Sequence, residues 1–221
     1  MLFLTCSRAR LWLSWPITRI DTVSPEVSVR GTSDGAWLNH SAGVVLAATS
    51  GSAAGASGVS NVASISYTLD GVAHTEAGAP AIDVLIPESP LASLNGTHTL
   101  TFHASDLAGN VSADQHFSVH IDTVGPTTVA KRANGRKGKK ILLKYLVRDN
   151  LSPLAGAVTL TVRNGHHRVV KTFKPGLKKV SAWYSIKWRP KAKGSYRYTV
   201  IARDLAGNKQ AKTGSAKIRV K

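Results

Sequence analysis

The sequence has very little cysteine, few aromatic residues and no long apolar run. A single cysteine among 221 residues excludes an internal disulfide framework. No apolar stretch approaches the roughly 18–20 residues that a membrane-spanning helix needs, so we expect no transmembrane segment. Aromatic residues make up 6% of the chain, yet 43% of it is hydrophobic, which is typical of globular domains. A chain of this length folds as one large domain or as two of ordinary size.

Acidic residues are nearly absent from the second half of the chain. Residues 1–122 contain 4 Lys and Arg against 10 Asp and Glu, a balance of −6. Residues 123–221 contain 25 against 2, a balance of +23, and the two halves add up to +17. This asymmetry predicts two structural units and a polyanionic neighbour for the second one.

The N-terminus lacks the order of a secretory signal. Arg8 and Arg10 separate two short apolar stretches, whereas a signal peptide places its charge before one unbroken apolar core. We interpret residues 1–17 as a doubtful leader or as the remnant of a truncated preceding segment. The whole chain is then expected to be the C-terminal piece of a longer protein.

Two motifs recur in the same order at nearly one period. Ile-Asp-Thr-Val-x-Pro stands at 20–25 and at 121–126, a spacing of 101, and Asp-Leu-Ala-Gly-Asn stands at 106–110 and 204–208, a spacing of 98. Apolar residues between the motifs alternate with period two, which predicts half-buried strands. Expected strands lie near 25–30, 43–49, 62–69, 72–76, 81–86, 97–105 and 113–121, and near 127–131, 139–148, 157–163, 167–173, 180–188, 194–203 and 213–220.

Glycine-containing dipeptides separate several of these strands. Asp70-Gly71 and Asn164-Gly165 predict two-residue hairpin turns, because both dipeptides supply positive φ angles. The pattern as a whole predicts an all-β chain of two tandem antiparallel β-sandwiches, each of about seven strands. One sandwich is expected over 18–122, with acidic character, and the other over 123–221, with strongly basic character.

The repeated phrases resemble those of tandem bacterial immunoglobulin-like repeats. The resemblance is carried by Ser57–Val59, Tyr67–Gly71, Gly96–His98, the motif at 106–110 and the closing Ile121–Thr123. The second copy is similar to the immunoglobulin-like domain of flagellar hook-capping proteins, through Trp188, Gly194–Tyr198 and the motif at 204–208.

The resemblance implies immunoglobulin-like or fibronectin-III-like sandwiches in an exported bacterial protein, at the cell surface or outside the cell. It implies a non-catalytic role as a spacer, stalk or adhesion module, with neighbouring immunoglobulin-like domains of a longer chain as partners. The alternative is a carbohydrate- or polyanion-binding accessory module of a larger secreted enzyme.

No pattern of catalytic residues is recognisable. Hydrolysis needs paired carboxylates or a nucleophile beside its base, and neither pattern stands out, so we expect no enzyme activity and no catalytic residues. His116 and His120 share a strand face but lie about 13 Å apart, too far for one zinc ion. Calcium is the remaining metal candidate, and its candidate ligands at the junctions and turns are Asp21, Asp106, Asn110 and Asp122. The favoured reading is that each Asp caps its own turn and that no cofactor is bound.

Candidate polyanion-binding residues gather in the second half. They are Lys131, Arg132, Arg136, Lys137, Lys139, Lys140, Lys174, Lys178 and Lys179. Such a surface attracts anionic polymers through counterion release, and an anionic cell-wall or envelope polymer is the expected partner. Nucleic acid is disfavoured because no nucleic-acid-binding motif is present. Solubility and protection of strand edges remain an alternative explanation of the lysines. Trp183 is a candidate for stacking on a sugar ring.

Overall fold

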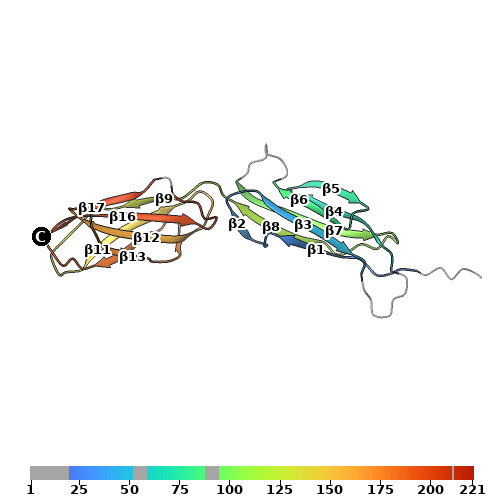
Figure 1. Ribbon diagram of the computed structural model, residues 1–221, viewed down its shortest axis with the longest axis horizontal. Helices are drawn as coiled ribbons and strands as arrows, with labels where there is room; N and C mark the ends of the chain where they lie inside the picture. Colours follow the sequence, from blue (N-terminus) through green and yellow to red (C-terminus); the bar gives the residue numbers. More distant parts are fainter. Residues whose placement is uncertain (1–19, 52–58, 88–94, 211) are drawn as a thin grey trace, which may run out of the picture.

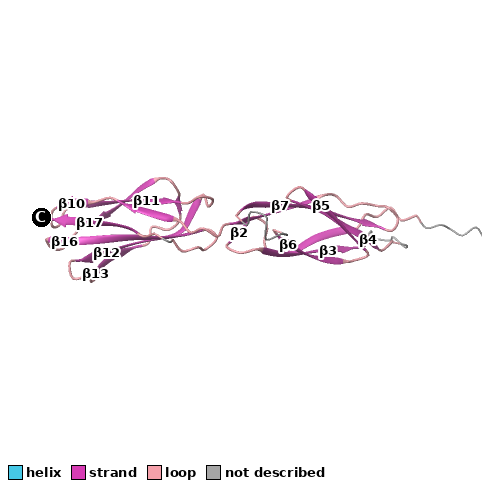
Figure 2. Cartoon of the chain, turned by 90° about the horizontal axis from the view of Figure 1, so that it is seen from above, coloured by secondary structure: helices cyan, strands magenta, loops and turns pink. Residues whose placement is uncertain are grey.

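The described part of the chain consists of strands and their connections. The computed structural model describes residues 20–51, 59–87, 95–210 and 212–221, and the predicted leader or remnant at 1–17 lies outside them. Figures 1 and 2 show two sandwiches of strands that follow one another along the long axis. The described residues contain no helical segment that could span a bilayer.

The first sandwich packs a three-stranded sheet on a five-stranded sheet. The sheet orders are β1-β3-β6 and β2-β8-β7-β4-β5. The strands are β1 (Glu26–Gly31), β2 (Ala36–Leu38), β3 (Ala42–Thr49), β4 (Val62–Leu69), β5 (Val72–Ala77), β6 (Ala81–Ile86), β7 (Gly96–Asp106) and β8 (Gln115–Ile121).

The second sandwich repeats this arrangement. Its sheet orders are β15-β11-β9 and β10-β17-β16-β12-β13, and β14 also pairs with β12. The strands are β9 (Thr127–Ala130), β10 (Ala133–Gly135), β11 (Ile141–Arg148), β12 (Leu154–Asn164), β13 (Val169–Phe173), β14 (Lys178–Lys179), β15 (Trp183–Trp188), β16 (Gly194–Asp204) and β17 (Gly214–Val220).

This strand order is that of an immunoglobulin-like fold. One sheet of each unit contains β1, β3 and β6 or, correspondingly, β9, β11 and β15. In the other sheet, β7 or β16 pairs with the first strand of the middle hairpin on one side and with the last strand of the unit on the other. The expectation of an all-β chain of tandem immunoglobulin-like sandwiches is confirmed. The domain limits at 18–122 and 123–221 stay predictions.

Period-two alternation builds a separate core in each unit. Leu100, Phe102 and Ala104 of β7 are at most 2% exposed, and the residues between them face outward or are half-buried. Tyr198 and Val200 of β16 are fully buried in the second core. Burying one such large side chain contributes about 1.5–3 kcal/mol. The two hydrophobic clusters share no residue, so each sandwich has a core of its own.

Three short strands that the alternation did not predict join the larger sheets. β14 has two residues and pairs with β12, and the other two extend the sheet edges. β2 runs parallel to β8, with Ala36 opposite Val119, and β10 runs parallel to β17, with Ala133 opposite Ile218. A strand of three residues is too short for a period-two pattern to stand out. The antiparallel sandwiches therefore each contain one parallel pair.

The two predicted hairpin turns have different outcomes. Asp70 and Gly71 have φ angles of 50° and 87° and form the expected two-residue turn between β4 and β5. The prediction for Asn164-Gly165 is wrong, because the positive φ of 62° falls on His167 instead. The Asn164 side chain accepts hydrogen bonds from the backbone N–H groups of His166 and Arg168, which favours a longer turn.

The two repeated motifs contact each other in both units. Asn110 donates its side-chain amide to the backbone oxygen of Asp21 at 3.1 Å. Asn208 donates to the backbone oxygen of Asp122 at 2.5 Å. The Asn that ends one motif thus holds the Asp of the other motif where the chain enters each sandwich, which explains why the motifs recur together.

Candidate anion-binding surface

Within the described residues, no ion pair compensates the basic charge of the second sandwich. Wherever the structure describes the chain, no Lys or Arg side chain lies within 4.0 Å of a carboxylate, and the ion pairs found there join His98 to Asp70 and His103 to Asp114. The two acidic residues among 123–221 are Asp149, which follows β11, and Asp204, which ends β16, and they lie close together at one end of the unit. The positive charge is therefore open to solvent ions or to an external anion.

Three cationic residues form a row across neighbouring strands. Arg163 of β12 lies directly opposite Arg197 of β16, and Arg197 lies directly opposite Lys217 of β17. All three are exposed, because they alternate with buried residues and point away from the core. Neighbouring strands lie about 4.8 Å apart, so the row places like charges close together. Arg219 follows two residues after Lys217 on the same face.

The row has polar neighbours, but none of the described carboxylates forms an ion pair with it. One guanidinium nitrogen of Arg163 donates to the backbone oxygen of His167 at 3.0 Å, and one of Arg197 donates to Ser215 Oγ at 3.0 Å. Directly opposed like charges destabilise a sheet by roughly 0.2–1 kcal/mol for each pair. The arrangement costs stability in the free protein and favours an anionic ligand.

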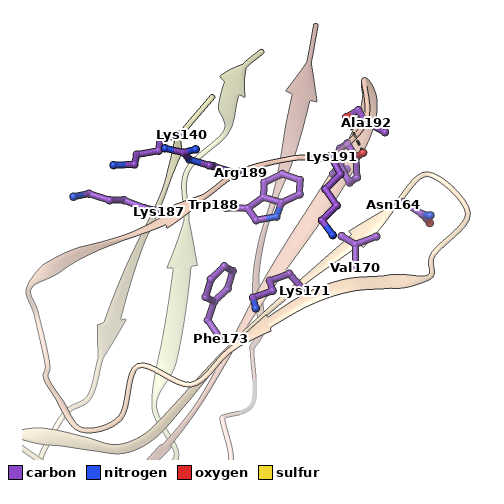
Figure 3. Close-up of a pocket in the computed structure, with 11 residues that line it drawn as sticks. Lys140, Asn164, Val170, Lys171, Phe173, Lys187, Trp188, Arg189, Lys191 and Ala192 are labelled. Atoms are coloured by element: carbon purple, nitrogen blue, oxygen red, sulfur yellow. Dashed lines mark hydrogen bonds between the residues drawn. The ribbon is translucent and has the colours of Figure 1, made fainter. Parts of the chain in front are cut away.

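A hollow of about 730 Å³ opens between the edges of the two sheets, beside this row. β15 is the edge strand of one sheet and β13 that of the other. Figure 3 shows Trp188 and Phe173 on these two strands, surrounded by basic side chains. The cationic residues that line the hollow are Lys140, Lys171, Lys187, Arg189 and Lys191.

Aromatic rings form the inner wall of the hollow. Trp188 is 7% exposed and meets Tyr196 edge-to-face, with the ring centroids 5.0 Å apart. The Lys171 ammonium lies 5.6 Å from the centre of the Phe173 ring. An aromatic wall beneath cationic side chains suits a ligand with both an apolar ring face and negative charge.

A second hollow, of about 630 Å³, continues the surface around the end of the unit. Both hollows are lined by Asn164 and Tyr196, so they adjoin. The second one includes the cationic row, and its basic lining residues are Arg132, Arg163, His167, Arg197, Lys217 and Arg219. Because Gly194 pairs with Val220, this end of the sandwich is the one that carries the C-terminus (Figure 1).

The basic residues expected from the sequence are spread over several places. Lys140 lines the first hollow and Arg132 the second. Arg136, Lys137 and Lys139 form the exposed turn before β11, beside the C-terminus, where the backbone N–H of Lys137 donates to Lys221. The remaining expected residues, which line neither hollow, are Lys131, Lys174, Lys178 and Lys179.

The residues that the sequence interpretation missed are those of the outer strand faces and hollow edges. They are Arg163, Lys171, Lys187, Arg189, Lys191, Arg197, Lys217 and Arg219. The alternation of Lys217 and Arg219 with the buried Ala216, Ile218 and Val220 was a usable signal. The sequence analysis instead favoured Arg136, Lys137 and Lys139 for polyanion binding, because they lie close together along the chain.

Trp183 lies outside both hollows. Its side chain is 46% exposed, and the Lys131 ammonium stands 4.2 Å from the centre of its ring. A sugar that stacks on this face must first displace the lysine. The role of Trp183 in sugar binding stays a prediction.

The calcium candidates of the first unit make a hydrogen-bonded network. Asp21 accepts the backbone N–H groups of Val23 at 2.9 Å and Ser60 at 2.6 Å, and the latter bond contributes most to lowering its pKa. Burial acts to raise the pKa of Asp106, but hydrogen bonds led by those from Asn110 lower it overall. These carboxylates are satisfied as turn and junction caps.

Asp122 lies apart from these three candidates. Its carboxylate meets those of Asp149 and Asp204, which the sequence interpretation did not propose as ligands. Burial raises the pKa of Asp122, and the charges of Asp149 and Asp204 raise it further.

No protein family matches the sequence, and no curated protein does. Among solved structures, the fibronectin-III-like modules of CbhA from Clostridium thermocellum are 16% identical over 89% of this chain and 94% of theirs, with a TM-score of 0.42. The FN1–FN3 domains of chicken CNTN1 are 13% identical over 89% of this chain and 67% of theirs, with a TM-score of 0.38. The I9–I11 tandem from titin is 14% identical over 88% of this chain and 65% of that one, with a TM-score of 0.33. Because these TM-scores are low, the immunoglobulin-like fold is assigned from the strand order of the chain itself.

Proposed function

We propose that this chain is a non-catalytic spacer or adhesion module of an exported bacterial protein, and that the C-terminal end of its second sandwich binds an anionic polymer of the cell envelope. The observation that carries the proposal is the row formed by Arg163, Arg197 and Lys217, which has no carboxylate partner within the described residues. A polymer with regularly spaced negative groups would neutralise the row and the lysines of the adjoining hollow together.

Counterion release supplies the driving force. Each cation that contacts an anionic group frees a condensed counterion from the polymer, so binding weakens as salt rises. The first sandwich is acidic, since residues 1–122 have a balance of −6, and it therefore has no such attraction to the polymer.

The aromatic wall of the hollow favours a polymer that contains sugar rings. The half-buried Phe173 offers apolar ring surface beside Lys171 and Lys187, over the buried Trp188. This observation also supports a second candidate function, an accessory module that brings a secreted enzyme to a carbohydrate. Retention on an uncharged polysaccharide, unaffected by salt, would favour that second function.

Retention on purified anionic cell wall tests the proposal. The triple variant Arg163→Gln, Arg197→Gln, Lys217→Gln is expected to lose most of the retention at low salt. The matched control is Lys144→Gln, Lys209→Gln, Lys212→Gln, which removes the same charge from exposed residues that line neither hollow and were not expected to bind the polymer. Equal loss in both variants would show that net charge alone is responsible, and it would contradict a defined surface.

A further inference from the structure

Three aspartate carboxylates converge where the chain passes from the first sandwich to the second. Asp122 follows β8, Asp149 follows β11 and Asp204 ends β16. One carboxylate oxygen from each residue lies within 4.8 Å of the other two. Asp122 is fully buried, Asp204 is 3% exposed and Asp149 is half-buried.

One carboxylate oxygen of Asp122 and one of Asp149 accept no hydrogen bond. Asp122 Oδ1 accepts the backbone N–H of Val124 at 2.9 Å, and Asp149 Oδ1 accepts that of Ser152 at 2.8 Å. The Oδ2 atoms of Asp122 and Asp149 are buried and have no hydrogen-bond partner. Buried carboxylate oxygens are nearly always paired, so two unpaired ones at one place call for a cation or a proton.

The surrounding charge makes this arrangement unusual. Residues 123–221 contain 25 Lys and Arg, yet none of those that the structure describes lies within 4.0 Å of these carboxylates. Asp149 and Asp204 are also the two acidic residues of that half of the sequence, and both lie in this cluster. If Asp149 and Asp204 only capped their own turns, nothing would require both acidic residues of the basic sandwich to lie against Asp122.

The first sandwich provides an internal comparison. The corresponding residues are Asp21 and Asp106, but the β3–β4 connection brings Ser60 to them where the β11–β12 connection brings Asp149 to its pair. Both oxygens of Asp21 accept backbone N–H groups, and both oxygens of Asp106 accept donors from Asn110. At one junction every carboxylate oxygen of the aspartate pair accepts a hydrogen bond. At the other, Asp204 is likewise paired through Asn208, but Asp122 and Asp149 each keep one unpaired oxygen.

We propose that Asp122, Asp149 and Asp204 bind one divalent cation, Ca²⁺ by preference, which fastens the inter-sandwich connection to the second unit. The ligand atoms are hard carboxylate oxygens, and the cluster contains no His or Cys that would favour zinc. Several carboxylates in an irregular cage suit Ca²⁺ better than Mg²⁺, which keeps most of its waters. Carbonyl oxygens and water would complete the coordination.

Titration of CaCl₂ into the EDTA-treated full chain tests this proposal. We expect one equivalent to bind, with a Kd on the order of 0.1–1 mM, as for other extracellular modules. The melting temperature should rise by at least about 4 °C at 10 mM Ca²⁺. Absence of both binding and a melting shift would overturn the proposal.

Asp149→Asn separates metal binding from a structural role. Asparagine keeps the Oδ1 acceptor for Leu151 and Ser152 but removes one charge, so Ca²⁺ affinity should fall at least tenfold. In EDTA the same variant should melt at or above the wild-type temperature, because a like charge has left the triad. The control Asp83→Asn removes an exposed carboxylate outside the cluster and should leave Ca²⁺ affinity unchanged. Unchanged affinity in Asp149→Asn, or a lower melting temperature in EDTA, would contradict the site.

Discussion

Asn208 holds Asp122 at the entrance of the second sandwich. Its side-chain amide donates to the backbone oxygen of Asp122 at 2.5 Å and to Asp204 Oδ2 at 2.7 Å. Its backbone N–H donates to Asp204 Oδ1 at 2.7 Å. One side chain thus closes the β16–β17 turn and fastens it to the incoming chain, and Asn110 repeats the arrangement with Asp21 in the first sandwich.

Asn208→Ala is expected to destabilise the second sandwich. The substitution leaves the Asp122 carbonyl and one Asp204 oxygen without their donor, which costs about 1–3 kcal/mol of unfolding free energy. Chemical unfolding of the full chain measures the change. Asn134→Ala, at an exposed residue of β10, is the control and should stay within about 0.5 kcal/mol of wild type.

Two fully buried tyrosines should respond in opposite ways to loss of the hydroxyl. The Tyr198 hydroxyl lies 2.6 Å from the backbone oxygen of Lys131 and 2.7 Å from that of Lys144, and the two carbonyls share its one hydrogen, whereas the Tyr145 hydroxyl has no hydrogen-bond partner. Tyr198→Phe should cost about 1–2 kcal/mol of unfolding free energy, and Tyr145→Phe should be neutral or stabilising. Equal destabilisation by both substitutions in denaturant titrations would show that the hydroxyls are equivalent and would contradict this difference.

The same tyrosines predict a loss of stability in alkali. Burial raises the pKa of both Tyr145 and Tyr198 to about 12, above the ordinary value near 10. A pKa raised in the folded state contributes stability that is complete below pH 10 and is lost as pH rises from 10 to 12. Unfolding midpoints between pH 9 and 12 should therefore fall, and less steeply in Tyr145→Phe, which folds with one such group fewer. An identical slope in the variant would exclude Tyr145 from the effect.

Arg197→Gln should make the protein more stable and a weaker binder. Removing the central charge of the row relieves its opposition to both Arg163 and Lys217, worth roughly 0.2–1 kcal/mol for each pair at low salt. Melting in 10 mM and 500 mM NaCl should show the gain at the lower salt concentration only, because salt screens exposed charges. A loss of stability at low salt would mean that the Arg197–Ser215 hydrogen bond outweighs the repulsion.

The alternation of apolar residues was sufficient to predict the longer strands and the repeat of the fold. It placed Leu100 and Phe102, and likewise Tyr198 and Val200, in the two cores, because side-chain direction along a strand follows from local sequence alone. β2 and β10 were not predicted, because a strand of three residues is too short to show a period of two. The Asn164 turn was mispredicted because its own side chain stabilises a longer connection.

The candidate sites depend on pairings between distant segments, which local sequence does not contain. Arg163, Arg197 and Lys217 become a row only through the register of three strands. Asp149 resembles an ordinary turn cap in the sequence, and only the fold brings it to Asp122 and Asp204. Composition gave part of the signal for the carboxylate cluster, because Asp149 and Asp204 are the two acidic residues among 123–221.

Salt dependence of binding to a purified anionic cell-wall polymer tests the proposed function most directly. For the full chain, the logarithm of the binding constant should fall linearly with the logarithm of the salt concentration. The slope should become shallower by about 2 in the Arg163→Gln, Arg197→Gln, Lys217→Gln variant, since each lost contact with a flexible polyanion removes about 0.7. Binding that does not weaken with salt, or a slope that the three substitutions leave unchanged, would contradict the account.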